Sequence, residues 1–277
     1  MIRRAVVEGQ FYPDDKDELQ SMIRRSYEHK FGPGIQPPSN SDEKIFGVIC
    51  PHAGYMYSGP TACHSYYAIS SLTPELVIII GPNHFGIGSN VATMTNAEWQ
   101  TPLGTIKVDS NAALEAEKKS NIIEIDYYSH SKDHSLEVQI PMLQYTLTNE
   151  FQILPIIMMA QNFKTANDVG MVVADIAKSR NAIIIGSSDF THYEKNSFAH
   201  IQDEALIRPI LEMNVKEFYQ VLEEKNVSAC GFGAIASTII ACKKLGATKG
   251  ELLSYATSGD VIGDKDSVVG YGSIKFV

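Results

Sequence analysis

The stretch Leu76-Val-Ile-Ile-Ile-Gly-Pro-Asn-His-Phe-Gly86 holds the pattern that decides the fold. Its opening run, 76–80, is wholly apolar and mostly β-branched, which is typical of a strand buried on both faces of a sheet. Gly81 and Pro82 then end the run, and His84 follows shortly after them. We therefore predict a buried central strand that delivers an imidazole to the carboxyl edge of a sheet.

Two further apolar runs have the same arrangement. The run at 45–50 leads to His52, and the run at 181–185 leads to Asp189 and His192. In open α/β sheets, ligands bind in the crevice beyond the carboxyl ends of the strands. If the three strands are neighbours, these side chains and the histidine after 76–80 meet in one crevice.

The remaining sequence alternates between helix-length segments and short apolar runs. The expected helices cover 16–29, 60–70, 111–119, 135–147, 166–179, 197–213, 216–224 and 233–244. Further strands are expected at 151–158, 252–257 and 268–276, with weaker ones at 91–95 and 105–108 beside a hairpin-like 99–104. Strands spaced by helices predict an α/β fold, with one domain over 1–277 and a central, largely parallel or mixed sheet flanked by helices.

The composition excludes several classes of protein. The 277 residues are 44% hydrophobic and 20% charged, as in ordinary globular domains. Lys and Arg number 23 against 32 Asp and Glu, a net charge of −9 without a basic cluster, so we expect no nucleic-acid partner and no membrane surface. The apolar runs are too short to span a bilayer, and the start has no secretory pattern. Four scattered cysteines form no disulfide scaffold, and we expect a cytoplasmic protein.

The histidines after the three strands carry the main chemical signal. Histidine is a frequent metal ligand, and imidazoles at this density suit a transition-metal ion. The alternative for each one alone is a loop histidine that hydrogen-bonds the backbone. Three histidines after three strands favour the metal site.

Two other motifs each have a chemical and a purely structural interpretation. In Asp133-His-Ser-Leu-Glu137, at the start of an expected helix, His134 and Glu137 share a face. His134 is either an acid–base group or a bystander beside acidic residues that favour the helix N-terminus. Cys230 precedes another helix, where a thiol becomes a thiolate ligand or nucleophile, or else remains an inert apolar side chain.

At these residues the sequence resembles the Memo family, named for a mediator of cell motility. The family's motifs occur in order almost from end to end, which makes the resemblance specific. They lie at 4–13, 51–59, 81–84, 99–104, 134–141, 187–192, 230–231 and 269–271.

The Memo family is similar in fold to the class III, LigB-type extradiol dioxygenases, which are non-haem iron enzymes. The resemblance implies that His52 and His84 hold a metal ion and that His192 acts beside the substrate. Cys230 stands where those dioxygenases have a glutamate ligand, and Asp189 is the nearest carboxylate by motif. A thiolate changes the metal preference, so catechol ring cleavage does not follow. The resemblance also implies a functional association with a radical-SAM protein.

Three functions are open at this point. The first is a metal-dependent redox protein with an unknown substrate and one transition-metal ion, iron or copper, with zinc as the third choice. The second is a non-catalytic binding module that holds a peptide or a small aromatic ligand on the same scaffold. The third is a zinc hydrolase.

The residue roles follow from the first of these functions. The metal ligands are expected to be His52, His84 and Cys230, and the catalytic groups His192, His134 and Asp189. The side chains expected to bind a small-molecule or peptide ligand are Tyr55, Phe85 and Glu137, since aromatic rings with polar tips commonly line such crevices.

Overall fold

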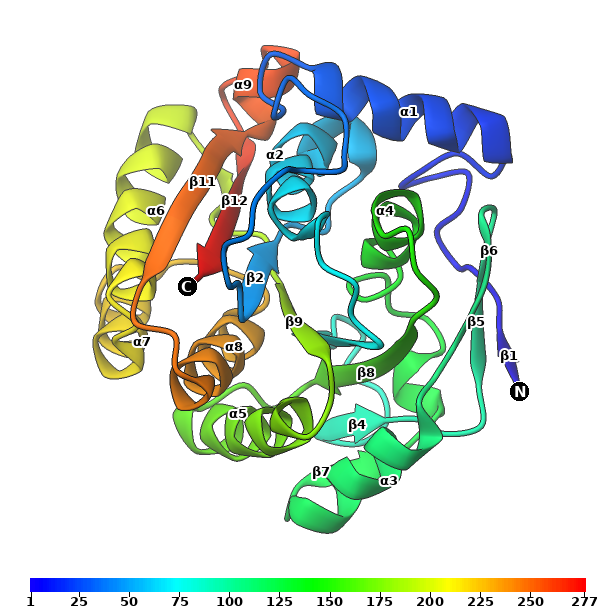
Figure 1. The fold of residues 1–277 in the computed structure, drawn as a ribbon. Coiled ribbons are helices and arrows are strands. Elements are labelled where there is room, and N and C mark those ends of the chain that lie inside the picture. The colour runs from blue at the N-terminus through cyan, green and yellow to red at the C-terminus, as the bar shows by residue number, and fades with distance from the viewer.

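The computed structural model describes all 277 residues. Its centre is a nine-stranded sheet with the order β10-β12-β2-β9-β3-β8-β4-β7, in which β11 also pairs with β12 (Figure 1). Four adjacent parallel strands form the middle of the sheet: β2 (Gly47–Cys50), β9 (Ala182–Ser187), β3 (Leu76–Pro82) and β8 (Gln152–Met158). The prediction of an α/β domain with a largely parallel or mixed sheet is therefore confirmed.

Antiparallel pairs extend the sheet on both sides. On one side, the long strand β12 (Val268–Phe276) pairs with β2, with β10 (His192–Glu194) and with β11 (Gly250–Thr257). On the other side, β4 (Val91–Thr93) is antiparallel to β8 and parallel to β7 (Ile123–Ile125). The sheet is therefore mixed only at its margins.

A separate sheet of three strands lies beside the N-terminal segment. Its members are β1 (Ile2–Arg3), β5 (Glu98–Thr101) and β6 (Gly104–Lys107). The hairpin expected around 99–104 thus connects β5 to β6. The run at 91–93 pairs instead with β8 in the main sheet. The sequence pattern indicated neither β1 nor the short strands β7 and β10, because two or three residues are too few to show a period.

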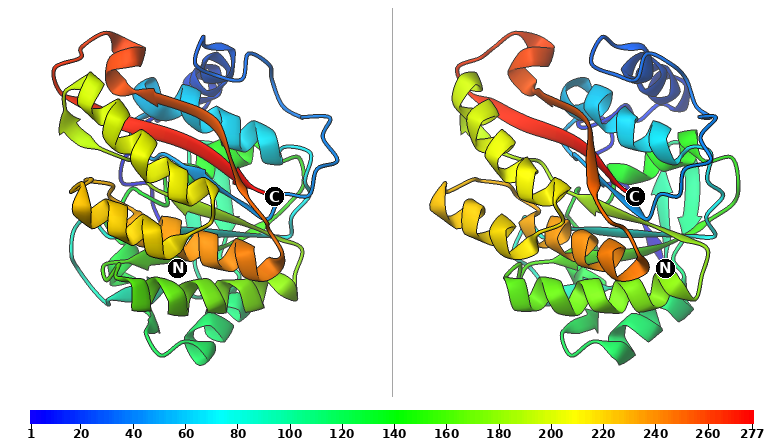
Figure 2. Two further views of the ribbon diagram at one scale, coloured as in Figure 1. Left: turned by 90° about the vertical axis from the view of Figure 1, so that its left-hand side faces the viewer. Right: turned by 60° about the vertical axis from the view of Figure 1, so that its left-hand side comes forward.

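Helices cover both faces of the main sheet (Figure 2). One face carries α1 (Lys16–Glu28), α2 (Tyr55–Ile69) and α4 (Gln139–Thr146). The other carries α3 (Ser110–Lys119), α5 (Phe163–Lys178), α6 (Asn196–Leu211), α7 (Val215–Glu224) and α8 (Phe232–Leu245). The short helices η1 (Tyr128–His130) and α9 (Ser258–Ile262) lie in connections. None of these helices combines the length and the apolar character needed to cross a bilayer.

The central strands are apolar throughout because they face two cores. In β3, Ile78 and Ile80 belong to the core beneath α5 and α8, whereas Val77 and Ile79 belong to the core beneath α1 and α2. All four side chains are fully buried. A strand covered by helices on both sides needs an uninterrupted apolar run, which is the signal that the sequence contains.

Helix α2 starts earlier than the expected 60–70. Its first residue is Tyr55, and Pro60 lies inside the helix. The Tyr55 N–H donates to the Phe11 carbonyl at 2.8 Å, and the Ser58 hydroxyl donates to the Ala53 carbonyl. Since proline is most common at the first helical position, the sequence pattern placed the start too late. Helix α4 differs in the other direction and starts at 139 rather than 135.

A buried ion pair ties the N-terminal segment to the body. The Arg3 guanidinium lies 2.5 Å from the Glu137 carboxylate, and the two side chains are 2% and 1% exposed. Arg3 also donates to the carbonyls of His130 and Asp133, at 2.8 and 2.6 Å, and lies 3.9 Å over the Trp99 ring. A charge this deeply buried is tolerated only when its partner and further hydrogen bonds compensate its desolvation.

Replacing Arg3 by methionine should therefore leave the Glu137 carboxylate buried without its counter-charge. We expect Arg3→Met to lower the free energy of unfolding by about 3–5 kcal/mol, measured by urea denaturation. The neighbouring Arg4 is exposed, so Arg4→Met is the matched control and should stay within about 0.5 kcal/mol of the wild type. Equal losses in the two variants would show that the ion pair does not anchor the segment.

Candidate metal centre

A crevice of about 580 Å³ lies at the carboxyl ends of the parallel strands. His52 follows β2, His84 follows β3, and Asp189 and His192 follow β9. The structure thus brings together the side chains that the three strand ends were expected to deliver. His134, from the segment before α4, also lines the crevice. Aromatic and aliphatic side chains complete the wall: Phe11, Tyr57, Tyr193, Ile262, Val269 and Tyr271.

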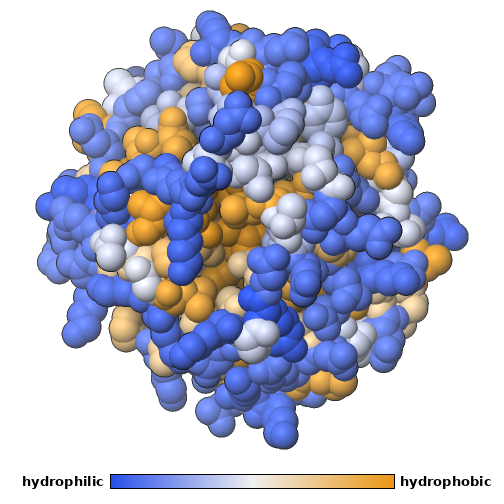
Figure 3. All heavy atoms as spheres, viewed as in Figure 1, coloured by the Kyte–Doolittle hydropathy of each residue, from blue (hydrophilic) through white to orange (hydrophobic).

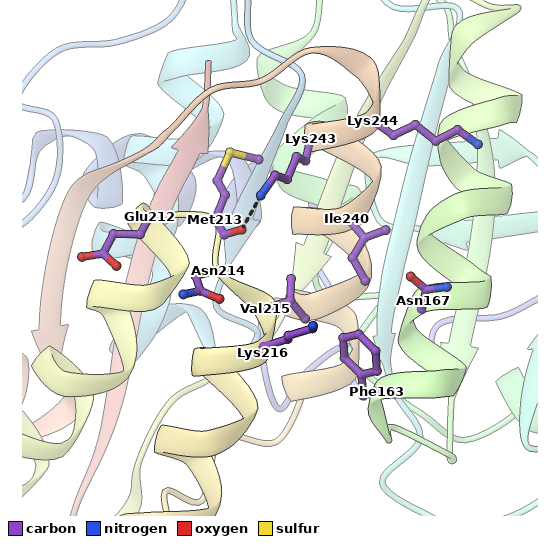
Figure 4. A pocket seen from close by; sticks show the side chains of 10 residues that line it. All are labelled: Phe163, Asn167, Glu212, Met213, Asn214, Val215, Lys216, Ile240, Lys243 and Lys244. Atoms are coloured by element: carbon purple, nitrogen blue, oxygen red, sulfur yellow. Dashed lines mark hydrogen bonds between the residues drawn. The ribbon is translucent and has the colours of Figure 1, made fainter.

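Two other grooves of similar volume lack this chemistry. One, of about 600 Å³ between α5, α7 and α8, presents lysine, asparagine and apolar side chains (Figure 4). The other lies at the amino ends of the parallel strands, on the face where Figure 3 shows an apolar hollow. Neither groove is lined by a histidine or a cysteine. The crevice is therefore the candidate site on chemical grounds.

Hydrogen bonds fix the tautomer of His52. The Ser187 hydroxyl has a single proton, which it donates to the Ser135 carbonyl at 2.7 Å. The Gln139 side-chain amide also donates to Ser187 Oγ, at 2.8 Å. The 2.8 Å contact between His52 Nδ1 and Ser187 Oγ must then have Nδ1–H as the donor. The Nε2 of His52 is therefore unprotonated and offers a lone pair.

His52 is also held neutral. It is only 1% exposed, and this burial, together with the nearby His84 and His134, keeps the pKa of His52 well below its usual value. A neutral imidazole is the form that binds a metal ion.

His84 and His192 also donate a hydrogen bond from Nδ1, but to other acceptors. His84 Nδ1 lies 3.1 Å from the Asp133 carboxylate, which also accepts the His84 backbone N–H at 2.6 Å. His192 Nδ1 lies 2.7 and 2.9 Å from the carbonyls of Phe190 and Ser228, neither of which can donate. In both rings Nδ1 therefore carries a proton, and Nε2 makes no hydrogen bond to another protein group. Partners of this kind are typical of metal-binding histidines.

Asp133 is a strong orienting group because it stays charged. Its burial works against the charge, but hydrogen bonds from His84 and Ser135 hold the pKa of Asp133 well below its usual value. The sequence suggested only a charge at a helix terminus for this residue. Its role at His84 depends on a contact between residues 49 positions apart, which no local pattern reveals.

Cys230 lies against His52 in the turn before α8 and is not part of the crevice lining. Its Sγ is 3.2 Å from His52 Nε2, and the Asp189 N–H donates to Sγ at 3.3 Å. Gln161 holds the turn, since its side chain donates to the Cys230 carbonyl and accepts from the Gly233 N–H. Burial raises the pKa of the Cys230 thiol, so the metal-free protein holds it as S–H. A bound metal ion would release this proton, because thiolate is the ligating form.

Asp189 is a buried carboxyl beside this pair. It accepts the His52 backbone N–H at 2.8 Å. Burial raises the pKa of Asp189 to about 6, against the opposing effect of His192 and the His52 N–H. The group can therefore gain or lose a proton near neutral pH.

The donor atoms form two compact sets that share His52. In one set, ligand atoms of His52, His84 and His134 all lie within 4.8 Å of one another, and in the other those of His52, Asp189 and Cys230 do. The expected ligands His52, His84 and Cys230 span both sets. Neutral imidazole, thiol and carboxyl groups at this spacing fit a transition-metal ion.

The three side chains expected to contact a ligand lie elsewhere. Tyr55 is buried in the core, where its hydroxyl donates to the Val138 carbonyl at 2.6 Å. Glu137 is committed to the ion pair with Arg3, and Phe85 is 53% exposed outside the crevice lining. Because α2 begins at residue 55, its first ring turns inward, and Tyr57 takes the place at the crevice.

The fold and the family of this chain both have counterparts among known proteins. A solved structure of an uncharacterized protein, JW3007, from Escherichia coli K12 matches with a TM-score of 0.57 over 84% of this chain and 100% of that chain. Their sequences are 10% identical, so the likeness shows the shared α/β fold alone. The family model described as Memo-like protein matches residues 3–275, and the chain belongs to the Memo family.

Full-length relatives support the family assignment. A MEMO1 family protein of Nitrosopumilus maritimus is 66% identical over 277 residues, which covers 100% of both chains. MEMO1 family proteins of Methanopyrus kandleri and Methanocaldococcus jannaschii are 45% and 47% identical, with at least 98% of each chain covered.

The half-buried His134 allows a test of the crevice electrostatics in metal-free protein. Burial, reinforced by His84, lowers the pKa of His134 to about 4, and unfolding restores the ordinary value of about 6.5. The unfolded state therefore binds more protons between these values, so stability falls as the pH drops through this window. We expect His134→Gln to reduce the slope of unfolding free energy against pH by about 1.4 kcal/mol per pH unit there, measured by urea denaturation.

The same pair of proteins provides the control. Above about pH 7, His134 is neutral in both the folded and the unfolded state, so the two slopes should coincide. Equal slopes in the acidic window would contradict a folded-state His134 that resists protonation.

Proposed function

We propose that this Memo family protein is a metal-dependent redox protein that holds one iron or copper ion through His52, His84 and Cys230. The observation that carries the proposal is that His52 and His84 line the crevice with their Nδ1 atoms committed to protein acceptors, which leaves Nε2 to bind a metal ion. A thiol sulfur 3.2 Å from His52 Nε2 adds a soft donor. Thiolate together with imidazole suits ions that change oxidation state.

Bound iron or copper would supply electron transfer and Lewis-acid polarisation. The chain itself supplies proton handling around that ion. Asp189 exchanges a proton near neutral pH, since burial brings its pKa to about 6. His192 lines the crevice, and two backbone carbonyls hold its ring in place through Nδ1. These two groups are therefore the proposed acid–base pair.

The thiol at this position separates the proposal from ring-cleaving chemistry. A face of two histidines and one carboxylate favours Fe(II) and leaves positions open for oxygen and substrate. Here Cys230 lies against His52, and the buried Asp189 carboxyl is hydrogen-bonded to the backbone beside it. We therefore propose a redox protein with a mixed nitrogen and sulfur donor set, and leave its substrate open.

A second candidate, a binding module, draws support from the wall of the crevice. Phe11, Tyr57 and Tyr271 present rings around the polar floor. Tyr193 is 78% exposed at the mouth, in the left-handed backbone region with φ +60°. Strain of this kind at a ligand-lining residue is a common feature of functional sites. This candidate differs from the first because binding of a peptide or small aromatic ligand would need no metal.

Metal analysis tests the first candidate. Protein purified anaerobically and loaded with Fe(II) or Cu(I) should retain close to one ion per chain after desalting, by elemental analysis. We expect His52→Ala, His84→Ala and Cys230→Ala each to weaken binding by at least about tenfold, because each removes a donor. His29, at the end of α1 and outside the crevice lining, gives the control variant His29→Gln. Wild-type protein without stoichiometric metal, or His52→Ala with unchanged metal content, would overturn the proposal.

A further inference from the structure

His134 differs from the other crevice histidines in its hydrogen bonding. Neither of its ring nitrogens makes a hydrogen bond to another protein group, whereas His52, His84 and His192 each commit Nδ1 to a protein partner. Its ring is nevertheless fixed by packing. It lies 4.6 Å from the Phe11 ring and 4.5 Å from the His84 ring, measured between centroids, with an angle of only 16° between the two imidazoles.

The His134 ring also faces His52. The two ring centroids are 5.5 Å apart with an interplanar angle of 81°, and His52 and His84 are 5.2 Å apart at 82°. Ligand atoms of the three residues lie within 4.8 Å of one another. Three imidazoles thus gather at the crevice floor, and hydrogen bonds at Nδ1 hold two of the rings in place.

We propose that His134 is a metal ligand and completes a three-imidazole site with His52 and His84 for a divalent ion of the Zn(II) or Co(II) type. This inference rests on the proposed function in that both use His52 and His84. It adds a ligand set that leaves Cys230 out. His52 Nε2 has one lone pair, so it serves either the set with His134 or the set with Cys230 at a given moment.

Ligand chemistry decides which set a metal ion uses. Imidazole nitrogen suits borderline divalent ions, and thiolate sulfur suits soft Cu(I). Three histidines with an open fourth position are a known arrangement for Zn(II). The carboxylate of Asp133, behind His84, and the carboxyl of Asp189 provide the negative charge that a dication in a buried crevice requires. The crevice therefore offers distinct sites for two classes of metal ion around one shared histidine.

The position of His134 explains why its ring has no other partner. Its neighbour in sequence, Asp133, holds His84 from behind through Nδ1. The His134 ring stacks nearly parallel to the same ring, and the Phe11 ring from the N-terminal segment packs against His134 at an angle of 45°. A donor that is oriented by packing and left without a hydrogen-bond partner is available to a bound ion.

The test compares two variants with two metal probes. His134→Phe keeps an aromatic ring in the stack between Phe11 and His84 but removes both nitrogens. We expect it to weaken Co(II) and Zn(II) binding by at least about tenfold, and to change the visible Co(II) absorption bands, while Cu(I) binding is unchanged. Cys230→Ser is the matched control and should show the reverse: weakened Cu(I) binding with Co(II) affinity and bands as in the wild type.

The outcomes separate this inference from the proposed function. If His134→Phe binds Co(II) with wild-type affinity and wild-type bands, His134 is not a ligand, although the metal site itself stands. If wild-type protein binds neither Co(II) nor Cu(I), the proposed function and this inference both fail. Circular dichroism confirms folding, and His134→Gln, which keeps a polar side chain of similar length, replaces the phenylalanine variant if that variant does not fold.

Discussion

The single proton of the Ser187 hydroxyl is the constraint on which the crevice depends. Because this proton goes to the Ser135 carbonyl, Ser187 can only accept from His52, and the His52 lone pair must point away from β9. The donors and acceptors come from three separate segments, after β2, before α4 and at the end of β9. The parallel arrangement of the central strands is what brings these segments together. The hydrogen bonds of one hydroxyl group thus connect the central sheet to the candidate site.

The N-terminal segment acts on the same site from the opposite direction. Arg3 donates to the Asp133 carbonyl, while the Asp133 side chain holds both the backbone and the ring of His84. Glu137 in turn accepts from the backbone N–H groups of residues 6 and 7 and from the Tyr12 hydroxyl. This places Phe11 against the His134 ring. The N-terminal segment therefore forms one wall of the crevice and supports one of its histidines.

The sequence predicts the central strands and their histidines well because both signals are local. A strand covered on both faces needs an unbroken apolar run, and a site at strand ends places His52 and His84 directly after such runs. The orienting groups escape prediction, since Ser187, Gln139 and Asp133 act across the fold. Tyr55 and Tyr57 show a third limit. Which ring faces the crevice depends on the phase of α2, and starting that helix at residue 60 loses the phase.

The tautomers of the crevice histidines test the central claim most directly. Nitrogen-15 NMR of metal-free protein at neutral pH distinguishes a protonated from an unprotonated ring nitrogen in each imidazole. The hydrogen bonds described here require Nδ1–H in His52, His84 and His192, and an unprotonated Nε2 in His52, which burial keeps neutral. Signals that show an unprotonated Nδ1 in His52 or His84 would contradict an arrangement built to present lone pairs to a metal ion.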